Sequence, residues 1–322
     1  MDARAADWFE RRTSTAGDWP LERCLRLRAQ TGTRVSVIVP ARDEADTIGD
    51  VVGTLRRDVL DVGLVDELVV IDSDSTDDTA AVAAAAGAVV HASRDVAPEL
   101  GTLPGKGEAL WKSLLVTTGD VLVFVDADLT EWGPHFVTGL LGPLLADPGV
   151  RLVKAFYDRL LDEAAAPAGG GTAPAGGSSS TDGGRVTELV ARPLLSLWWP
   201  HLAAVVQPLA GEWAVRRSLA VELPFPVGYG VELATLIDTA DRYGLDAVAQ
   251  VDLGSRGHRH QAVHDLAVMA GELLAVADAR RAAPRGVPAE PVLHQYRRSE
   301  GGWRARPVPV AERPALQEVL GC

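Results

Sequence analysis

Cysteine, aromatic residues and long apolar runs are all scarce in this sequence. Only two cysteines occur among 322 residues, Cys24 and Cys322, which leaves no disulfide framework and no cysteine spacing for zinc. No apolar run approaches the roughly 20 residues of a membrane-spanning helix. The opening stretch, MDARAADWFERR, carries charges where a secretory signal needs an apolar core. We therefore expect a cytoplasmic protein that does not associate with a membrane.

Basic residues are also in the minority. Lys and Arg total 31 against 44 Asp and Glu, giving a net charge of −13, which argues against a nucleic-acid partner but allows local basic sites for anionic substrates. Hydrophobic residues make up 47% of the chain and aromatic residues 5%, as in an α/β protein rich in alanine and valine. The length suits one large domain, or one domain with a smaller appendage.

Strand-like and helix-like segments alternate through the first half of the chain. Apolar runs typical of strands occupy 34–41, 67–73, 87–93, 120–128 and 150–157, and helical patterns occupy 44–57, 76–86, 107–117 and 134–145. Strands separated by helices of this length imply right-handed crossovers and a mainly parallel sheet with helices on both faces. This α/β half resembles a Rossmann-like nucleotide-binding domain. It lacks the GxGxxG fingerprint, which disfavours a dinucleotide oxidoreductase.

Two aspartates end the most apolar of these strands. In VLVFVDADLT, residues 121–130, the apolar run stops at Asp126 and Asp128. Open α/β sheets bind ligands at the carboxyl ends of their strands, and alternate aspartates in a tight turn can bring an oxygen to a divalent cation that neutralises a sugar-nucleotide diphosphate. An isolated pair of this kind more often only ends a strand and starts a turn. The neighbouring motifs favour the metal interpretation.

Two segments near the first strands carry candidate nucleotide contacts. In VPARDE, Pro40 ends a strand, Ala41 leaves room for a flat base, and Glu44 can accept a hydrogen bond from a base N–H. An ordinary turn into a helix explains this segment equally well. In VIDSDST, Asp72 and Ser73 end the next strand and could hold uracil or a ribose hydroxyl, or cap the following helix.

Two further segments offer positive charge to an anion. Lys106 lies between two glycines in PGKGEALWKS, where the backbone can approach a nucleotide or its diphosphate, although such a lysine is more often part of a plain turn. In GGRVTELVARP, Gly184, Arg185 and Thr187 stand at the expected start of a helix, where free N–H groups, a guanidinium and a hydroxyl would bind phosphate or carboxylate. A loop that simply enters a helix would give the same pattern.

The segment GSRGHRH supplies candidate imidazole ligands. His258 could bind the same metal ion as Asp128, and a separate HxH site with His260 is a weaker possibility. A lone histidine is more often structural or exposed.

In their order along the chain, these motifs resemble one family. The segments VPARDE, VIDSDSTDDT, PGKGEALWKSL, GDVLVFVDADL, VKAFY, GGRVTELVARPLL, QPLAGE, GYGVELATLIDT and LGSRGHRH are similar to those of glucosyl-3-phosphoglycerate synthases, retaining glycosyltransferases of actinobacteria with a GT-A fold. The resemblance covers about residues 34–272. It implies transfer of glucose from a nucleoside-diphosphate glucose, usually UDP-glucose, to the 2-hydroxyl of 3-phosphoglycerate, with Mg2+ or Mn2+. We expect these small molecules as partners, and a homodimer.

The resemblance also implies roles for single residues. The uridine and phosphates would be bound by Pro40, Ala41, Glu44, Ser73 and Lys106. The ribose would be contacted by Asp126. The metal ligands would be Asp128 and His258, and the acceptor contacts Gly184, Arg185, Thr187, Tyr229 and His260.

Catalysis, by the same resemblance, involves Glu232, Leu209 and Asp128. Glu232 matches a carboxylate that contacts the donor sugar, where it could bind glucose hydroxyls or attack the anomeric carbon in a double displacement. We prefer a front-face, SNi-like reaction, in which the departing diphosphate helps to deprotonate the acceptor hydroxyl on the same face. The backbone at Leu209 would lie near the anomeric carbon, and catalysis would rest on positioning and charge stabilisation.

The chain departs from the family pattern mainly on the acceptor side. His260 stands where the family usually has asparagine, and the segment before Gly184 is unusually rich in glycine, alanine and serine. Ala127 replaces the usual serine between the two aspartates, which is a minor change. The acceptor could therefore be a different phosphorylated or carboxylated hydroxy acid. The sequence is also compatible with a mannosyl-3-phosphoglycerate synthase that uses GDP-mannose, and with a nucleotide-sugar binder without catalysis.

We expect five regions along the chain. They are an N-terminal helical extension (1–33), the nucleotide-sugar-binding Rossmann-like half (34–160), a flexible loop rich in glycine, alanine and serine (161–184), a mostly helical acceptor-binding half (185–283) and a C-terminal extended arm (284–322). Because apolar periodicity resumes directly after the loop, both halves are expected to form one catalytic unit.

Overall fold

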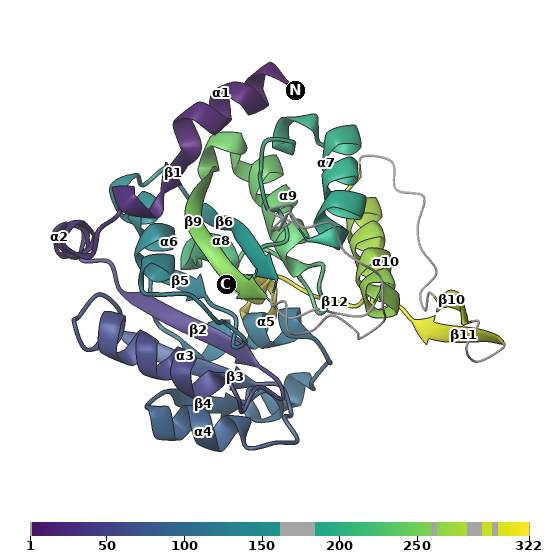
Figure 1. Cartoon of the computed structure of the whole chain (residues 1–322), viewed down its shortest axis with the longest axis horizontal. Coiled ribbons are helices and arrows are strands. Elements are labelled where there is room, and N and C mark those ends of the chain that lie inside the picture. Colours follow the sequence, from purple (N-terminus) through teal and green to yellow (C-terminus); the bar gives the residue numbers. More distant parts are fainter. Residues whose placement is uncertain (1, 162–183, 259–262, 282–291, 298–301, 322) are drawn as a thin grey trace, which may run out of the picture.

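A mainly parallel sheet runs through the protein (Figure 1). The computed structural model describes residues 2–161, 184–258, 263–281, 292–297 and 302–321. Over these residues the main sheet has eight strands in the order β1-β9-β6-β7-β5-β2-β3-β4. Their bounds are β1 Thr13–Thr15, β2 Val35–Ala41, β3 Glu67–Asp72, β4 Val89–Ala92, β5 Val121–Phe124, β6 Leu152–Leu161, β7 Trp213–Arg216 and β9 Val248–His258.

All neighbouring strands of this sheet are parallel except those that flank β7, which runs antiparallel to both β5 and β6. The predicted mainly parallel sheet is therefore confirmed. Strand β7 was not expected, because its four residues follow the QPLAGE segment without a recognisable alternation. Its insertion places Trp213, the start of this antiparallel strand, beside the carboxyl end of β5 and beside Lys154 of β6.

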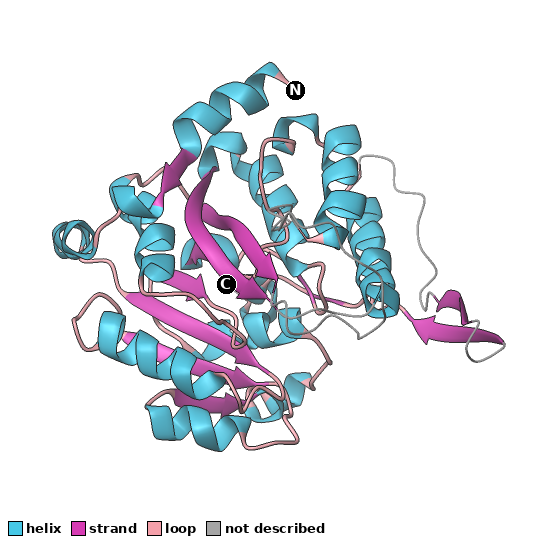
Figure 2. Ribbon diagram, viewed as in Figure 1, coloured by secondary structure: helices cyan, strands magenta, loops and turns pink. Residues whose placement is uncertain are grey.

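Helices cover both faces of the sheet, as predicted (Figure 2). Their bounds are α1 Ala3–Arg12, α2 Leu21–Thr31, α3 Ile48–Leu55, α4 Thr79–Ala86, α5 Lys106–Val116, α6 His135–Ala146, α7 Arg192–Trp198, α8 Arg217–Ala220, α9 Val231–Tyr243, α10 Val263–Ala279 and α11 Leu316–Leu320. Helix α3 begins four residues later than the sequence pattern indicates, because Glu44 lies in the turn that precedes the helix. The N–H of Glu44 donates to Thr79 Oγ1 at 2.8 Å. None of the described helices is both long and apolar enough to cross a membrane.

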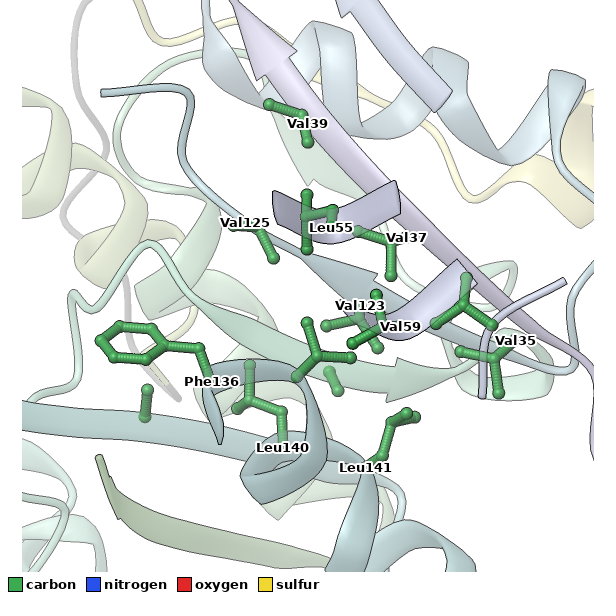
Figure 3. Close-up of a cluster of buried hydrophobic side chains, with 14 of the residues drawn as sticks. Val35, Val37, Val39, Leu55, Val59, Val123, Val125, Phe136, Leu140 and Leu141 are labelled. Atoms are coloured by element: carbon green, nitrogen blue, oxygen red, sulfur yellow. The ribbon is translucent and has the colours of Figure 1, made fainter. Parts of the chain in front are cut away.

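Side chains alternate along the central strands between two apolar cores, one on each face of the sheet. Val37 and Val39 of β2 belong to one core, and Ile38 between them belongs to the other. In Figure 3, valines of β2 and β5 meet Phe136 and Leu140 of α6 in the first core. Because both faces are buried, these strands read as continuous apolar runs, and each fully buried side chain of this size contributes about 1.5–3 kcal/mol.

The two ends of the chain differ from the expected extensions. Strand β1 pairs with β9, so the N-terminal region is more than a helical extension and forms an edge of the main sheet. The C-terminal region is more than an extended arm. A hairpin of β10 (Val292–Arg297) and β11 (Gly302–Pro307) projects from the body in Figure 1, and then β12 (Glu312–Arg313) returns to pair with β8 (Phe225–Pro226).

A buried ion pair explains why the C-terminal residues return to the body. Arg313 Nη2 lies 2.7 Å from Oε1 of Glu108, a carboxylate of α5 that is 1% exposed, and Trp111 Nε1 donates to the carbonyl of Pro314. The many prolines and arginines of this region indicated an arm. The partner of Arg313 is 205 residues away in sequence, and no local pattern reveals it.

Candidate active site

The candidate site lies along one edge of the main sheet, where the carboxyl ends of its parallel strands meet. Strand β2 ends at Ala41, β3 at Asp72, β5 at Phe124 and β9 at His258. Strand β7 runs the other way, so it begins at this edge with Trp213. Apart from the residues in α5 and α9, the predicted donor and metal residues therefore lie at the ends of these strands or directly after them. Open α/β sheets bind ligands at this edge.

The expected nucleobase residues meet at the ends of β2 and β3. Ala41 is opposite Asp72 in the strand register, and the N–H of Ser73 donates to the carbonyl of Ala41 at 2.9 Å. Asp72 is buried, and its Oδ1 has no hydrogen-bond partner within the described part of the chain. A buried acceptor oxygen without a partner beside Ser73 suits an N–H or O–H donor of a nucleoside.

The turn that carries Glu44 is tied to the loop after β3. The N–H of Ala45 donates to Asp77 Oδ2 at 3.1 Å, and the N–H of Thr76 donates to Asp43 Oδ1 at 2.7 Å. These contacts keep Glu44 in the same corner of the sheet as the ends of β2 and β3. The structure thus brings together the predicted base-binding residues of both segments.

A largely buried ion cluster forms the centre of the site. Lys106 Nζ lies 2.6 Å from Asp126 Oδ1 and 3.0 Å from Glu232 Oε1. The Glu232 side chain is 5% exposed, and those of Lys106 and Asp126 are about one-fifth exposed or less. Burial acts to lower the pKa of Lys106, but the two carboxylates outweigh it and raise that pKa well above its usual range. The ammonium group therefore stays charged and joins α5, the turn after β5 and α9.

Two glycines allow this cluster to form. A Cβ atom at Gly107 would lie 1.8 Å from the carbonyl oxygen of Pro226, and one at Gly105 would lie 2.2 Å from that of Val227. Gly105 also has a φ of 135°, which side-chain-bearing residues rarely adopt. The start of α5 therefore packs directly on the backbone that leads into α9, where Glu232 lies in the first turn.

A turn before β7 packs on the other side of Asp126. The N–H of Ala210 donates to the carbonyl of Gln207, so Leu209 lies within the turn. A Cβ at Gly211 would lie only 2.2 Å from Asp126 Oδ2. Below the turn, the Nζ of Lys154 donates to the carbonyl of Ala210 at 2.8 Å, and burial lowers the pKa of Lys154 to about 8.

Strand β6 holds the same turn through further polar side chains. Tyr157 Oη donates to Glu212 Oε2 at 2.7 Å, and the side-chain amide of Gln207 donates to the carbonyl of Tyr157 at 2.5 Å. Sequence reasoning missed Lys154 and Glu212 as site residues. The available signal was a set of polar residues within the otherwise apolar VKAFY and QPLAGE segments.

A cavity of about 350 Å³ opens beside this turn. Its wall includes Tyr157, Gln207, Arg192 and Asp252, from β6, the turn, α7 and β9. Arg192 Nε binds Glu188 at 2.9 Å, and its Nη2 donates to the carbonyl of Val206. The cavity therefore lies between the turn that contains Leu209 and the helical segment that begins with the predicted acceptor residues.

The predicted acceptor residues occupy the start of that helical segment. The N–H of Glu188 donates to the carbonyl of Gly184 at 3.0 Å, so the helix starts at this point, as the sequence indicates. Arg185 is exposed and Thr187 is buried. Tyr229, which lies two residues before α9, is 45% exposed. His260 lies outside the described residues.

The predicted metal ligands lie at the same sheet edge. Asp128 is in the turn that follows β5, and His258 is the last residue of β9. Among the residues that the structure describes, no three His, Cys, Asp or Glu side chains form a ready metal cluster. One carboxylate and one imidazole nevertheless suit Mn2+ or Mg2+ when diphosphate oxygens and water complete the coordination.

Comparison with known proteins identifies the family. The family described as Glycosyl transferase family 2 matches residues 36–160. A protein from Mycolicibacterium paratuberculosis named glucosyl-3-phosphoglycerate synthase is 44% identical over 326 residues, which cover 99% of this chain and 94% of that protein. The chain belongs to the glucosyl-3-phosphoglycerate synthase family. The resemblance inferred from the motifs is thereby confirmed.

A solved structure supports the glucosyl-3-phosphoglycerate synthase fold over nearly the whole chain. The synthase of Mycobacterium tuberculosis, in complex with Mn2+, UDP-glucose and phosphoglyceric acid, matches with a TM-score of 0.80 and 42% identity over 94% of this chain and 95% of that one. This confirms the GT-A fold. A mannosylglycerate synthase of Rhodothermus marinus is 33% identical over only 38% of this chain, so the mannosyl hypothesis has much weaker support.

Proposed function

We propose that this protein transfers glucose from UDP-glucose to the 2-hydroxyl of 3-phosphoglycerate with retention of the anomeric configuration and with Mn2+ or Mg2+. The observation that carries the proposal is the match, over almost the full length of both chains, to a synthase solved with Mn2+, UDP-glucose and phosphoglyceric acid. The largely buried cluster around Lys106, at the carboxyl edge of the sheet, supplies the charged centre that such a reaction needs.

In this proposal the donor lies across the ends of β2, β3 and β5. Pro40, Ala41, Glu44 and Ser73 bind the uridine, with Asp72 as a further acceptor. Lys106 contacts the diphosphate, and Asp126 contacts the ribose. The position of Ala41 opposite Asp72, and the hydrogen bond between Ser73 and Ala41, support a shared base pocket.

Asp128 and His258 would hold the divalent cation. When bound, the cation neutralises charge that develops on the departing diphosphate. The Lys106 ammonium adds a second positive charge near the same group, and its two carboxylate partners keep it protonated. Charge stabilisation of the leaving group is therefore shared between the cation and this chain's own side chain.

The ion pair of Glu232 favours a front-face reaction over double displacement. Glu232 Oε1 lies 3.0 Å from Lys106 Nζ, and an ammonium partner makes a carboxylate a weaker nucleophile. Glu232 then binds glucose hydroxyls, and the backbone at Leu209 lies beside the anomeric carbon. The acceptor hydroxyl approaches the face from which the diphosphate leaves and transfers its proton to a diphosphate oxygen.

The acceptor binds at Gly184, Arg185 and Thr187, with Tyr229 and His260 completing its pocket. Helix N–H groups and the exposed Arg185 guanidinium suit a phosphate or a carboxylate. The neighbouring cavity of about 350 Å³ is of a size that suits a small organic acid.

We also propose that the protein acts in the cytoplasm as a homodimer. Exposed apolar side chains on α7 and on the helical turn before it, with Leu197 75% and Leu189 77% exposed, provide a surface that a second copy could cover. Light scattering of the purified protein measures its molecular mass, and a monomer at all concentrations would contradict the dimer.

A product assay tests the function. Purified protein is incubated with 3-phosphoglycerate, Mn2+ or Mg2+ and a panel of nucleotide sugars, and the product is identified by mass and by the anomeric coupling in its NMR spectrum. We expect an α-linked glucosyl product from UDP-glucose. Efficient use of GDP-mannose without use of UDP-glucose, or no product from any donor, would overturn the proposal.

A further inference from the structure

We propose that Lys154 is a positioning residue for glucosyl transfer, whose ammonium group fixes the turn that contains Leu209 against the donor-sugar end of the site. The inference rests on the proposed function, because it takes Leu209 to lie beside the anomeric carbon. Lys154 does not itself touch a substrate in this proposal. It acts through the backbone of the turn.

The geometry places Lys154 directly under that turn. Its side chain is 1% exposed, and its Nζ donates to the carbonyl of Ala210, the residue after Leu209, at 2.8 Å. Its Nζ also lies 5.7 Å from the ring centroid of Trp213, which is opposite Lys154 in the β6–β7 pairing. The buried amine of Lys154 therefore links strand β6 to the backbone between Leu209 and Gly211.

Holding this turn also fixes the central ion cluster. Gly211 leaves no room for a Cβ atom against Asp126 Oδ2, so the turn and the Asp126 carboxylate are in direct contact. Asp126 in turn binds Lys106, which binds Glu232. A movement of the turn would therefore change the position of the residues proposed to contact the donor.

The charges that face Lys154 come from four other segments. They are Lys106 of α5, Asp126 after β5, Glu212 before β7 and Glu232 of α9. With both amines protonated, these five groups carry two positive and three negative charges, a sum of −1. Loss of the Lys154 proton makes the sum −2 and weakens the charge-assisted hydrogen bond that holds the turn at Ala210.

The proton on Lys154 can be lost within an accessible pH range. Burial lowers the pKa of Lys154 to about 8, and the carboxylates of Glu232, Glu212 and Asp126 only partly oppose this effect. We therefore expect kcat to fall as the pH rises above about 8, while the KM for UDP-glucose changes little, since the positioning matters most in the transition state.

Stability should move in the opposite direction from activity. Because the folded pKa of about 8 is below the unfolded value of 10.5, the stability linked to Lys154 is present above 10.5 and is lost as the pH falls through about 8. Between these values the contribution of Lys154 to stability rises with pH while kcat falls. If Lys154 only stabilised the fold, kcat would not fall between pH 8 and 10.5, because the contribution of Lys154 to stability rises over that range.

The test compares two buried lysines. Lys154→Met keeps an unbranched side chain that is one atom shorter, and it removes the charge. Lys112→Met is the matched control, because Lys112 is also fully buried and donates to a backbone carbonyl, that of Ser93, at 2.7 Å. Steady-state kinetics of glucosyl transfer are measured from pH 6.5 to 10 for both variants and the parent, and folding is checked by circular dichroism and by calorimetry with UDP.

We expect Lys154→Met to lower kcat about tenfold or more at pH 7 with a change in donor KM of less than about threefold, and to lack the parent's decline above pH 8. Lys112→Met should keep the parent's pH profile. A Lys154→Met enzyme with the parent's kcat and profile would overturn the inference. If that variant does not fold, the parent alone decides, because a kcat that stays constant up to pH 10 also overturns it.

The outcomes also separate this inference from the proposed function. If the parent makes no glucosyl product with any donor, the proposed function fails. If the parent is active and Lys154→Met matches it, only the positioning role fails.

Discussion

The backbone N–H of Tyr229 donates a hydrogen bond of 2.6 Å to Oε2 of Glu272, a carboxyl group of α10 that is only 4% exposed. Gly228 makes this approach possible, since a Cβ atom there would lie 2.0 Å from the same oxygen. The turn that leads to Glu232 is therefore held between α10 on one side and the start of α5 on the other.

Glu272→Gln should stabilise the protein at neutral pH. Burial, with the nearby Glu232 carboxylate adding to it, raises the pKa of Glu272 from 4.5 to about 7. The stability linked to Glu272 is therefore present below pH 4.5 and is lost as the pH rises through 7. The amide oxygen can still accept from Tyr229. Urea unfolding at pH 8 should show a gain of up to about 3 kcal/mol for the variant.

That gain should shrink as the pH falls toward 4.5. Glu318→Gln is the control, because Glu318 is exposed on α11 and should show the same small effect at each pH. Equal unfolding free energies for Glu272→Gln and the parent at pH 8 would contradict the prediction.

Lys106→Met should leave Asp126 and Glu232 without their shared cation. Breaking a buried ion pair by removing one partner costs about 3–5 kcal/mol, and the remaining carboxylates would repel the donor diphosphate. We expect a lower free energy of unfolding and much weaker binding of UDP-glucose in calorimetry. Lys106→Met combined with Glu232→Gln should recover part of the stability, because the Glu232 carboxylate that Lys106 neutralises is then replaced by an uncharged amide. No recovery would argue against the ion cluster.

Gly107→Ala and Gly53→Ala should have opposite effects. At Gly107 a Cβ atom would lie 1.8 Å from a backbone oxygen of Pro226, so α5 must move and the Lys106–Glu232 contact must open. At Gly53, inside α3, nothing lies within 4 Å, and alanine should stabilise the helix by about 0.5–1 kcal/mol. Melting temperatures and turnover of the two variants test this pair, and a Gly107→Ala enzyme as active as the parent would contradict the close contact.

Asp128→Ala should lower turnover by orders of magnitude while folding persists. Asp95→Ala is the control, because Asp95 is exposed at the end of the short 3-10 helix Ser93–Asp95. The same pair should differ in Mn2+ binding, measured by electron paramagnetic resonance in the presence of UDP. Full activity of Asp128→Ala in the presence of a chelator would remove Asp128 from the metal site.

His260→Asn tests the departure from the family on the acceptor side. If His260 contacts the acceptor anion, the acceptor KM of the parent should rise with pH across the range in which histidine titrates. The asparagine variant should lose that dependence and keep or improve its use of 3-phosphoglycerate. Arg185→Lys should weaken acceptor binding in both backgrounds, because lysine cannot replace a bidentate guanidinium contact. Identical KM profiles for parent and His260→Asn would show that His260 does not contact the acceptor.

Local patterns in the sequence determine the sheet and the placement of most predicted site residues. A buried strand needs a continuous apolar run, and Asp126 and Asp128 follow such a run directly, so their position at the carboxyl edge of the sheet could be predicted. The same holds for Ala41 and Ser73 at the ends of β2 and β3, and for Gly184 at the start of a helix.

Tertiary packing alone decides which partner each buried charged group contacts. The Lys154 amine binds a carbonyl 56 residues away, Glu272 binds an N–H 43 residues away, and Glu108 binds Arg313 across 205 residues. Such contacts depend on how strands and helices stack, since β7 must insert between β5 and β6 before the Ala210 carbonyl can face Lys154. Hydrogen bonds and ion pairs act over a few ångströms in space. The order of residues along the chain does not show which distant residues come that close.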